Sequence, residues 1–256
     1  MKISLIQTDI VWANPQANAL HIEELLKKAP QSDIYVLPEM WSTGFATEPD
    51  HIAESDNGYG LNWMQRMANQ LDAAIAGSIA IKCSNDGSFR NRFYFVRPQE
   101  CALPEVNCDF YDKHHLFTYG GEHHHYTAGR ERVVTEWRGV RFLLLVCYDL
   151  RFPTWARNHE DYDCILCVAS WPTPRIHAWN SLLVARAIEN QCFVAGVDRV
   201  GRDPYCEYCG GTQFIDPYGK VVETYQPDTE MVITADIDMN MLRAFRQKFP
   251  VLKDRD

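Results

Sequence analysis

Residues 142–153 read FLLLVCYDLRFP, an apolar run that ends at a cysteine and continues into a short polar segment. The continuous apolar stretch from Val140 to Val146 suits a strand that is buried on both faces of a sheet. A short helix is expected from Phe152 to Asn158, so Cys147 stands where a buried strand gives way to a helix. Amides at a helix N-terminus lower the pKa of a thiol and can bind an oxyanion. Cys147 is therefore a candidate nucleophile, and the alternative is a buried structural cysteine.

On both sides of this stretch, predicted strands and helices alternate, which indicates the α/β class. Asn14 and Pro15 fit the N-cap and the first position of a helix, and the residues 216–219 (DPYG) form a strong turn signal. Two packed sheets with helices outside would accommodate the many strands. The expected strands are 3–8, 34–37, 73–81, 89–97, 140–146, 164–169, 192–197, 212–215, 221–224 and 231–237, and the expected helices are 15–28, 60–71, 152–158, 179–190 and 239–248, with a long irregular loop over 112–130.

Two further residues could take part in chemistry with Cys147. Glu39 follows a short apolar strand and precedes bulky residues, surroundings that raise the pKa of a carboxyl group and suit a general base. Lys113 lies among aromatic residues in FYDKHHLF and could place a fixed positive charge near a developing oxyanion. Taken singly, each is more typical of a surface residue.

The composition excludes some classes of function. The chain has 256 residues with a formal net charge of -9, and it lacks the clustered Lys and Arg that nucleic acids and anionic membranes attract. No apolar run approaches the roughly 20 residues of a membrane helix, and the first ten residues lack the apolar stretch of a signal peptide. We therefore expect a cytoplasmic protein, in which most of the nine cysteines are free thiols.

A zinc-binding, non-enzymatic protein is the main alternative from a different class. Five histidines fall at 114, 115, 123, 124 and 125, and two Cys-x-x-Cys pairs occur at 164/167 and 206/209. The first pair lies in a predicted strand, where positions i and i+3 face opposite sides and cannot easily share a metal. The pair Cys206/Cys209 has no obvious second pair. We therefore expect no metal site.

The motifs taken together resemble the nitrilase superfamily. They occur in the family's order as PEMWSTGF around Glu39, YDKHHLF around Lys113, GGEHHHYTAG, CYDLRFP at Cys147, ARAIENQCFVAG and GGTQFIDPYGKVV, and the resemblance covers nearly the whole chain. It implies a four-layer αββα sandwich in one domain over residues 1–256, and an association of two such chains into a homodimer.

The resemblance also implies roles for individual residues. Glu39 would be the base, Lys113 the stabiliser of the oxyanion and Cys147 the nucleophile that forms a thioester. Glu122 fits a second glutamate that positions the lysine, and the backbone N–H of Tyr148 would help to hold the oxyanion. No cofactor is implied.

The ω-amidase branch of the superfamily resembles this sequence most, through KHHLF, CYDLRFP and ARAIENQ. Its members hydrolyse the terminal amide of small α-keto dicarboxylic monoamides such as α-ketoglutaramate. We expect Arg175 to bind the substrate carboxylate, and Arg151, Arg186 and Glu189 to form bracing ion pairs. The expected apolar wall consists of Phe45, Tyr119, Trp171 and Trp179. An N-carbamoyl amidase, a nitrilase and a catalytically silent scaffold protein remain as alternatives.

Overall fold

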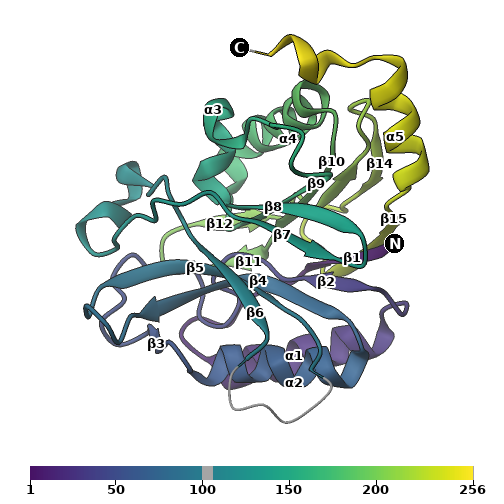
Figure 1. Ribbon diagram of the computed structural model, residues 1–256. Helices are drawn as coiled ribbons and strands as arrows, with labels where there is room; N and C mark the ends of the chain where they lie inside the picture. The colour runs from purple at the N-terminus through teal and green to yellow at the C-terminus, as the bar shows by residue number, and fades with distance from the viewer. Residues whose placement is uncertain (100–105, 256) are drawn as a thin grey trace.

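Two β-sheets lie face to face in the computed structural model of the chain, which describes residues 1–99 and 106–255 (Figure 1). The first sheet has the strand order β15-β1-β2-β4-β5-β6, and the short β3 pairs with β4. Strands β1, β2 and β4 run parallel, while β15, β5 and β6 are antiparallel to their neighbours. The bounds are β1 Lys2–Gln7, β2 Ile34–Val36, β3 Glu54–Ser55, β4 Ala74–Lys82, β5 Phe89–Val96, β6 Cys108–Asp112 and β15 Met231–Asp236.

The second sheet has the order β14-β13-β10-β9-β8-β7, with the parallel strands β10, β9 and β8 at its centre. A separate two-stranded ribbon, β11-β12, completes the strands of the described residues. The bounds are β7 Val134–Trp137, β8 Val140–Val146, β9 Cys164–Ala169, β10 Phe193–Asp198, β11 Val200–Arg202, β12 Glu207–Cys209, β13 Gln213–Ile215 and β14 Val221–Thr224.

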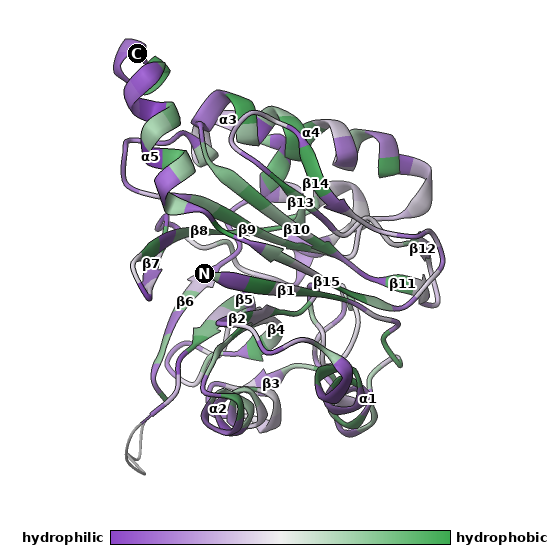
Figure 2. Cartoon of the chain, turned by 90° about the vertical axis from the view of Figure 1, so that its right-hand side faces the viewer, coloured by the Kyte–Doolittle hydropathy of each residue, from purple (hydrophilic) through white to green (hydrophobic). Residues whose placement is uncertain are grey.

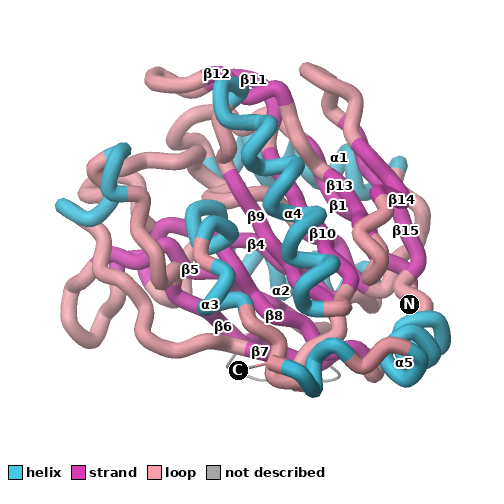
Figure 3. The backbone as a smooth tube through the Cα atoms, turned by 90° about the horizontal axis from the view of Figure 1, so that it is seen from above, coloured by secondary structure: helices cyan, strands magenta, loops and turns pink. Residues whose placement is uncertain are grey.

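Helices cover the outer face of each sheet, so the molecule has four layers. Helices α1 and α2 lie beneath the first sheet, and α3 and α4 lie above the second (Figures 1 and 3). Helix α5 lies beside the second sheet, above β15 in the view of Figure 1. The bounds are α1 Pro15–Lys28, α2 Tyr59–Leu71, α3 Pro153–Ala156, α4 Ile176–Asn190 and α5 Met239–Lys248, and short 3-10 turns are η1 Thr118–Gly120, η2 Glu122–His124, η3 Cys147–Arg151, η4 Thr173–Arg175 and η5 Val251–Asp254.

The alternation of side chains along β8 explains its unbroken apolar sequence. Phe142, Leu144 and Val146 pack between the two sheets. Leu143 and Leu145 point the other way and pack against the layer of α3 and α4. Both faces of the strand are thus covered by apolar neighbours, and the strands of both sheets are largely hydrophobic in Figure 2.

Most elements expected from the sequence are confirmed. The Asn14 side chain accepts the N–H of Ala17 at 3.1 Å and Pro15 opens α1. The residues 216–219 form the turn between β13 and β14, where the N–H of Gly219 donates to the carbonyl of Asp216. The αββα arrangement is confirmed as well.

The differences between the expected and the observed elements lie mainly at the sheet edges. Strands β6 and β7, which end one sheet each, carry mixed polar and apolar residues because they are only partly covered, and periodicity did not mark them as strands. Helix α4 starts at Ile176, three residues before the expected start. In the described part of the chain, no helix is both long and apolar enough to cross a membrane.

Candidate active site

Three of the four predicted catalytic residues follow the ends of strands, and the fourth lies in a loop. Glu39 lies in the turn after β2, Lys113 directly follows β6, and Cys147 directly follows β8. Glu122 lies in η2, within the long loop that the sequence predicted to be functional. The structure therefore brings together side chains from both sheets.

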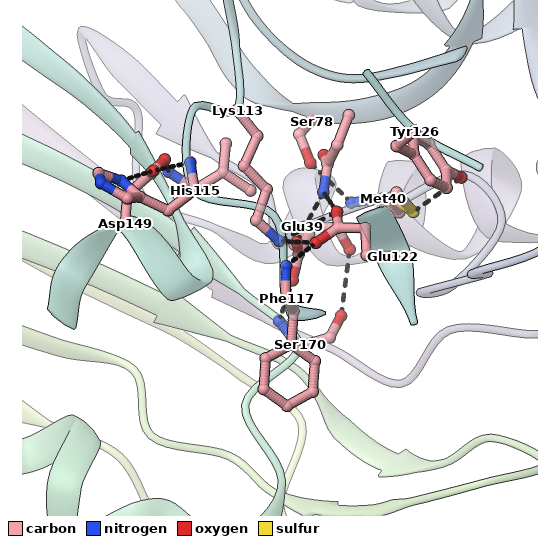
Figure 4. A network of polar contacts seen from close by, with 12 residues as sticks. Glu39, Met40, Ser78, Lys113, His115, Phe117, Glu122, Tyr126, Asp149 and Ser170 are labelled. Carbon is pink, nitrogen blue, oxygen red and sulfur yellow. Dashed lines mark hydrogen bonds and ion pairs between the residues drawn. The ribbon is translucent and has the colours of Figure 1, made fainter. Parts of the chain in front are cut away.

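Lys113 lies between the two glutamates (Figure 4). Its Nζ donates to Glu39 Oε1 at 3.0 Å and to the two carboxylate oxygens of Glu122 at 3.1 and 2.9 Å. All three side chains are fully buried. The second oxygen of Glu39, Oε2, accepts the backbone N–H of Ser170 at 2.9 Å, so the orientation of the carboxylate is fixed from both sides.

Asn91 on β5 also belongs to this network, although the sequence did not point to it. Its Nδ2 donates to Glu39 Oε1 at 2.7 Å and to Glu122 Oε1 at 3.3 Å. Asn91 is 1% exposed, and its backbone carbonyl accepts the backbone N–H of Lys113. The signal in the sequence was a polar residue at a buried position of the strand FRNRFYFV, because a buried polar side chain needs hydrogen-bond partners.

The two glutamates stabilise the charge of Lys113, while they disfavour each other's charge. Burial alone would lower the pKa of Lys113, but the carboxylates of Glu122 and Glu39 outweigh it and hold that pKa well above its ordinary value. Burial raises the pKa of Glu122, an effect that the Lys113 charge partly offsets and the charge of Glu39 reinforces. The lysine therefore stays a fixed cation that no proton transfer in the neutral range would discharge.

Cys147 occupies a tight turn at the end of β8. Its φ is +48°, in the left-handed region that non-glycine residues seldom adopt. Burial raises the pKa of the Cys147 thiol well above its ordinary value, and the nearby Glu39 raises it further, while Lys113 acts in the opposite direction. The resting group is thus a thiol, and a base must take its proton before it can attack a carbonyl.

Asp149 ties the loop of Lys113 to the turn of Cys147. Its Oδ1 accepts the backbone N–H and the ring Nδ1 of His115 at 2.8 and 2.9 Å, and its Oδ2 accepts the Tyr111 hydroxyl at 2.8 Å and the Val146 N–H at 3.1 Å. The ring of His115 stacks on Phe152 at 3.7 Å. The ring of His115 is thus held by packing and by its bond to Asp149.

Within residues 1–99 and 106–255, no three His, Cys, Asp or Glu side chains are grouped so that they could hold a metal ion.

A small cavity of about 50 Å³ opens above Cys147. Phe45, Trp171 and Arg175 line it, as does Tyr148, the second residue of η3. Its walls are mainly apolar and include five aromatic side chains, as is usual for sites that bind small molecules.

Two residues expected in the apolar wall do not reach this cavity. Tyr119 is 87% exposed, and its ring contacts Phe117, which takes the wall position instead. Trp179 is fully buried behind Trp171, and its Nε1 donates to the carbonyl of Gly211 at 2.7 Å. Trp179 faces the second sheet, where it belongs to the apolar cluster that packs α4 against the strands.

Arg151 also lines the cavity, contrary to the expected bracing role. Its guanidinium lies 4.9 Å from the Trp171 ring, and that of Arg175 lies 5.3 Å from the Phe117 ring. No carboxylate of the described residues pairs with either group. The expected ion pair between Arg186 and Glu189 is confirmed at 2.8 Å. The sequence carried no local signal for Arg151, because its place in the cavity wall depends on how the turn η3 is oriented in the fold.

Comparisons with known proteins agree with this geometry. The carbon-nitrogen hydrolase family model matches residues 2–247. The chain is 46% identical to an omega-amidase, YafV, of Escherichia coli (strain K12), over 100% of this chain and 97% of the relative. It is 35% identical to a 2-oxoglutaramate amidase of Bacillus subtilis (strain 168), over 98% and 96% of the two chains.

Among solved structures, XC1258 from Xanthomonas campestris is similar at a TM-score of 0.93 and 39% identity, over 100% of this chain and 97% of that one. It is described as a CN-hydrolase superfamily protein with an arsenic adduct in the active site. The chain therefore belongs to the carbon-nitrogen hydrolase family, within the nitrilase superfamily and its ω-amidase-like branch.

Proposed function

We propose that this protein is an ω-amidase that hydrolyses α-ketoglutaramate to α-ketoglutarate and ammonia. The observation that carries the proposal is one cavity that holds Cys147 beside a buried Glu39–Lys113 pair together with two unpaired arginines. The omega-amidase and 2-oxoglutaramate amidase relatives support it over their full length. They do not favour an N-carbamoyl amidase, a nitrilase or a zinc-binding scaffold.

The reaction begins with transfer of the Cys147 thiol proton to Glu39. The sulfur then attacks the amide carbon, and the oxyanion is held by the Lys113 ammonium and the backbone N–H of Tyr148. Glu39 returns the proton to the leaving nitrogen, ammonia departs, and a thioester remains on Cys147. Glu39 next takes a proton from water, which attacks the thioester and releases the acid and the thiol. Glu122 and Asn91 hold Lys113 and Glu39 in position throughout.

The two arginines supply the site for the substrate's carboxylate. Their guanidinium groups lie over aromatic rings of the cavity wall and have no carboxylate partner among the described residues. A charged group of this kind gains a charge-assisted hydrogen bond when a carboxylate arrives. We infer that Arg151 and Arg175 together anchor the end of the substrate that is remote from the amide.

The decisive assay measures ammonia release from α-ketoglutaramate beside an N-carbamoyl amino acid and a nitrile. We expect release from the keto-acid amide alone, and a loss of at least about 10³-fold in Cys147→Ala, because the nucleophile is gone. Turnover of the carbamoyl compound or the nitrile in preference to the amide would overturn the proposed substrate class.

Arg151→Ala and Arg175→Ala should each raise KM for α-ketoglutaramate about tenfold or more, because each removes a charge-assisted contact worth roughly 1.5–3 kcal/mol. Their KM for a neutral amide such as butyramide should change less than about twofold. Arg243→Ala, on the exposed side of α5, is the matched control and should change neither value. Equal losses on both substrates would contradict the carboxylate role.

We also propose that two of these single-domain chains form a homodimer in the cytoplasm. Support comes from an exposed apolar patch formed by Ile188 on α4, Tyr218, Phe245 on α5 and Phe249, which we call the α4–α5 patch. Ile188, Tyr218 and Phe249 are each more than half exposed. The eight cysteines of the described residues are free thiols, the state that a reducing compartment maintains.

A further inference from the structure

Asp198 is a buried carboxyl group that the mechanism above does not use. It is the last residue of β10, pairs with Ala169 at the end of β9, and is fully buried. Its Oδ1 accepts the backbone N–H of Trp171 at 2.7 Å and that of Arg199 at 2.9 Å. Asp198 therefore holds the chain just after β9, where it turns toward the cavity.

The same turn orients the general base. The N–H of Ser170 donates to Glu39 Oε2 at 2.9 Å, and the Ser170 hydroxyl donates to the Glu39 carbonyl at 3.4 Å. Two adjacent peptide N–H groups thus donate to two carboxyl groups, Glu39 on one sheet and Asp198 on the other. Any shift of Asp198 would move Ser170 and with it the Glu39 carboxylate.

The surroundings of Asp198 disfavour a negative charge. Its Oδ2 is buried and has no hydrogen-bond partner within the described part of the chain. The groups that interact with it electrostatically include Glu39, Cys147, Cys209 and Arg199. Of these only Arg199 is a cation, and its guanidinium is turned away to Asp9, with Nη2 2.7 Å from Asp9 Oδ1.

Burial is the main reason that the pKa of Asp198 lies well above its usual range. The two backbone N–H groups at Oδ1 act against this rise, and the charge of Glu39 adds to it. A fully buried carboxylate with only one oxygen hydrogen-bonded to the protein is costlier in its ionised form than as a neutral acid.

We propose that Asp198 is a positioning residue that works as a neutral carboxylic acid, holding the Ser170–Trp171 turn against Glu39 without adding a second negative charge beside the base. The proposal rests on the proposed role of Glu39 as the base. An ionised Asp198 would oppose formation of the Cys147 thiolate, since like charges repel strongly at low dielectric. The neutral form supplies the acceptor that the turn needs and avoids this cost.

The test compares two substitutions of Asp198. Asp198→Ala removes the acceptor of the Trp171 N–H, and kcat for ammonia release should fall about tenfold or more with little change in KM. Asp198→Asn keeps an acceptor and the size of a neutral acid, so it should rescue most of this loss. Its profile of kcat/KM against pH should move by less than about half a pH unit.

Infrared spectroscopy gives a readout that does not depend on turnover. The carbonyl stretch of a protonated carboxylic acid should be present at pH 7 in the wild type and weaker by one group in Asp198→Asn. This measurement remains decisive if Asp198→Ala does not fold, or if the true substrate is another amide. Asp163→Asn is the matched control, because the Asp163 carboxylate is paired with Arg141 and Arg246 and should contribute no such band.

Four results would overturn the proposal. The first is an Asp198→Asn enzyme as impaired as Asp198→Ala, and the second is a shift of its pH profile by about one unit or more, which removal of a nearby charge would cause. The third is a carboxylic-acid band in Asp198→Asn that is as strong as in the wild type. Full activity in Asp198→Ala would equally exclude a positioning role.

Discussion

Cys147 has to present a thiol from a backbone conformation that favours glycine. A φ of +48° brings the Cβ of an L-residue close to its own carbonyl, at a cost of about 1 kcal/mol. The gain is geometric, because the chain leaves β8 sharply and the side chain meets the cavity. Strain of this kind is typical of sites where function fixes the residue type.

Cys147→Gly should therefore be more stable than Cys147→Ala by about 1 kcal/mol, since glycine adopts this φ without strain. Thermal unfolding of the two purified variants measures the difference. Cys164 in β9 provides the control: it is fully buried in extended backbone, so Cys164→Gly should be the less stable of its pair. If the glycine variant were the less stable of the pair at position 147 as well, the turn at Cys147 would carry no strain.

The individual site residues differ in how far the sequence could identify them. Glu39, Lys113, Glu122 and Cys147 occur in recognisable motifs, and the structure brings all four together. Asn91 and Arg151 have no such context, because their roles depend on which strand and which turn face the cavity. A short stretch of sequence does not contain that information.

Asp163 joins two elements at the far end of the second sheet. It accepts hydrogen bonds from Arg141 on β8 at 2.9 Å and from Arg246 on α5 at 2.9 Å, and its side chain is 5% exposed. Burial alone would raise the pKa of Asp163, but the hydrogen bonds and charge of Arg141, aided by Arg246, outweigh it and lower that pKa. The carboxylate thus fastens α5 to the strands.

Asp163→Asn should lower the free energy of unfolding at pH 7 by about 1–2 kcal/mol, a value discounted because Arg141 is partly solvent-screened. Because the folded-state pKa is depressed, this contribution is present above the pKa of the unfolded carboxyl, about 4, and is lost as pH falls through the lower folded value. Urea unfolding of both proteins from pH 7 down to pH 3 checks this. A difference that grows on acidification would contradict the pairing.

Among the elements, the central ones were the most predictable. Continuous apolar runs located β8 and β9, the capping residues Asn14 and Pro15 located the start of α1, and the expected bounds of α1 and α5 agree with those observed. The edge strand β6 was missed because its residues alternate weakly and are half covered. Pairing with β5 makes it a strand, and pairing is a property of the tertiary fold.

At the scale of the whole molecule, the α4–α5 patch predicts self-association. Ile188→Glu should convert the dimer to a monomer, because it places a charge in an apolar contact. Light scattering coupled to size-exclusion chromatography measures the mass directly. Leu20→Glu is the matched control, since Leu20 is 63% exposed on α1 in the opposite outer layer and should leave the mass unchanged. A monomeric wild type would contradict the proposed dimer.

The layered arrangement itself could be expected from strand count and alternation, whereas the cavity could not. Its walls come from the loop after β2, the long loop before η1, the turn η3, the segment from the end of β9 to η4, and the chain at β12. These segments are far apart in sequence, and most of them lack periodicity. Their convergence follows from strand order, which no local pattern encodes.

The division of the catalytic groups between the two sheets has a consequence for how activity appears during folding. Glu39 and Lys113 extend from the first sheet, while Cys147 and Ser170 extend from the second. A chain in which only one sheet has formed holds a base without a nucleophile, or a nucleophile without a base. Recovery of ammonia release in a refolding experiment would therefore mark the docking of the two sheets, and partly folded chains would carry no premature thiol reactivity toward amides.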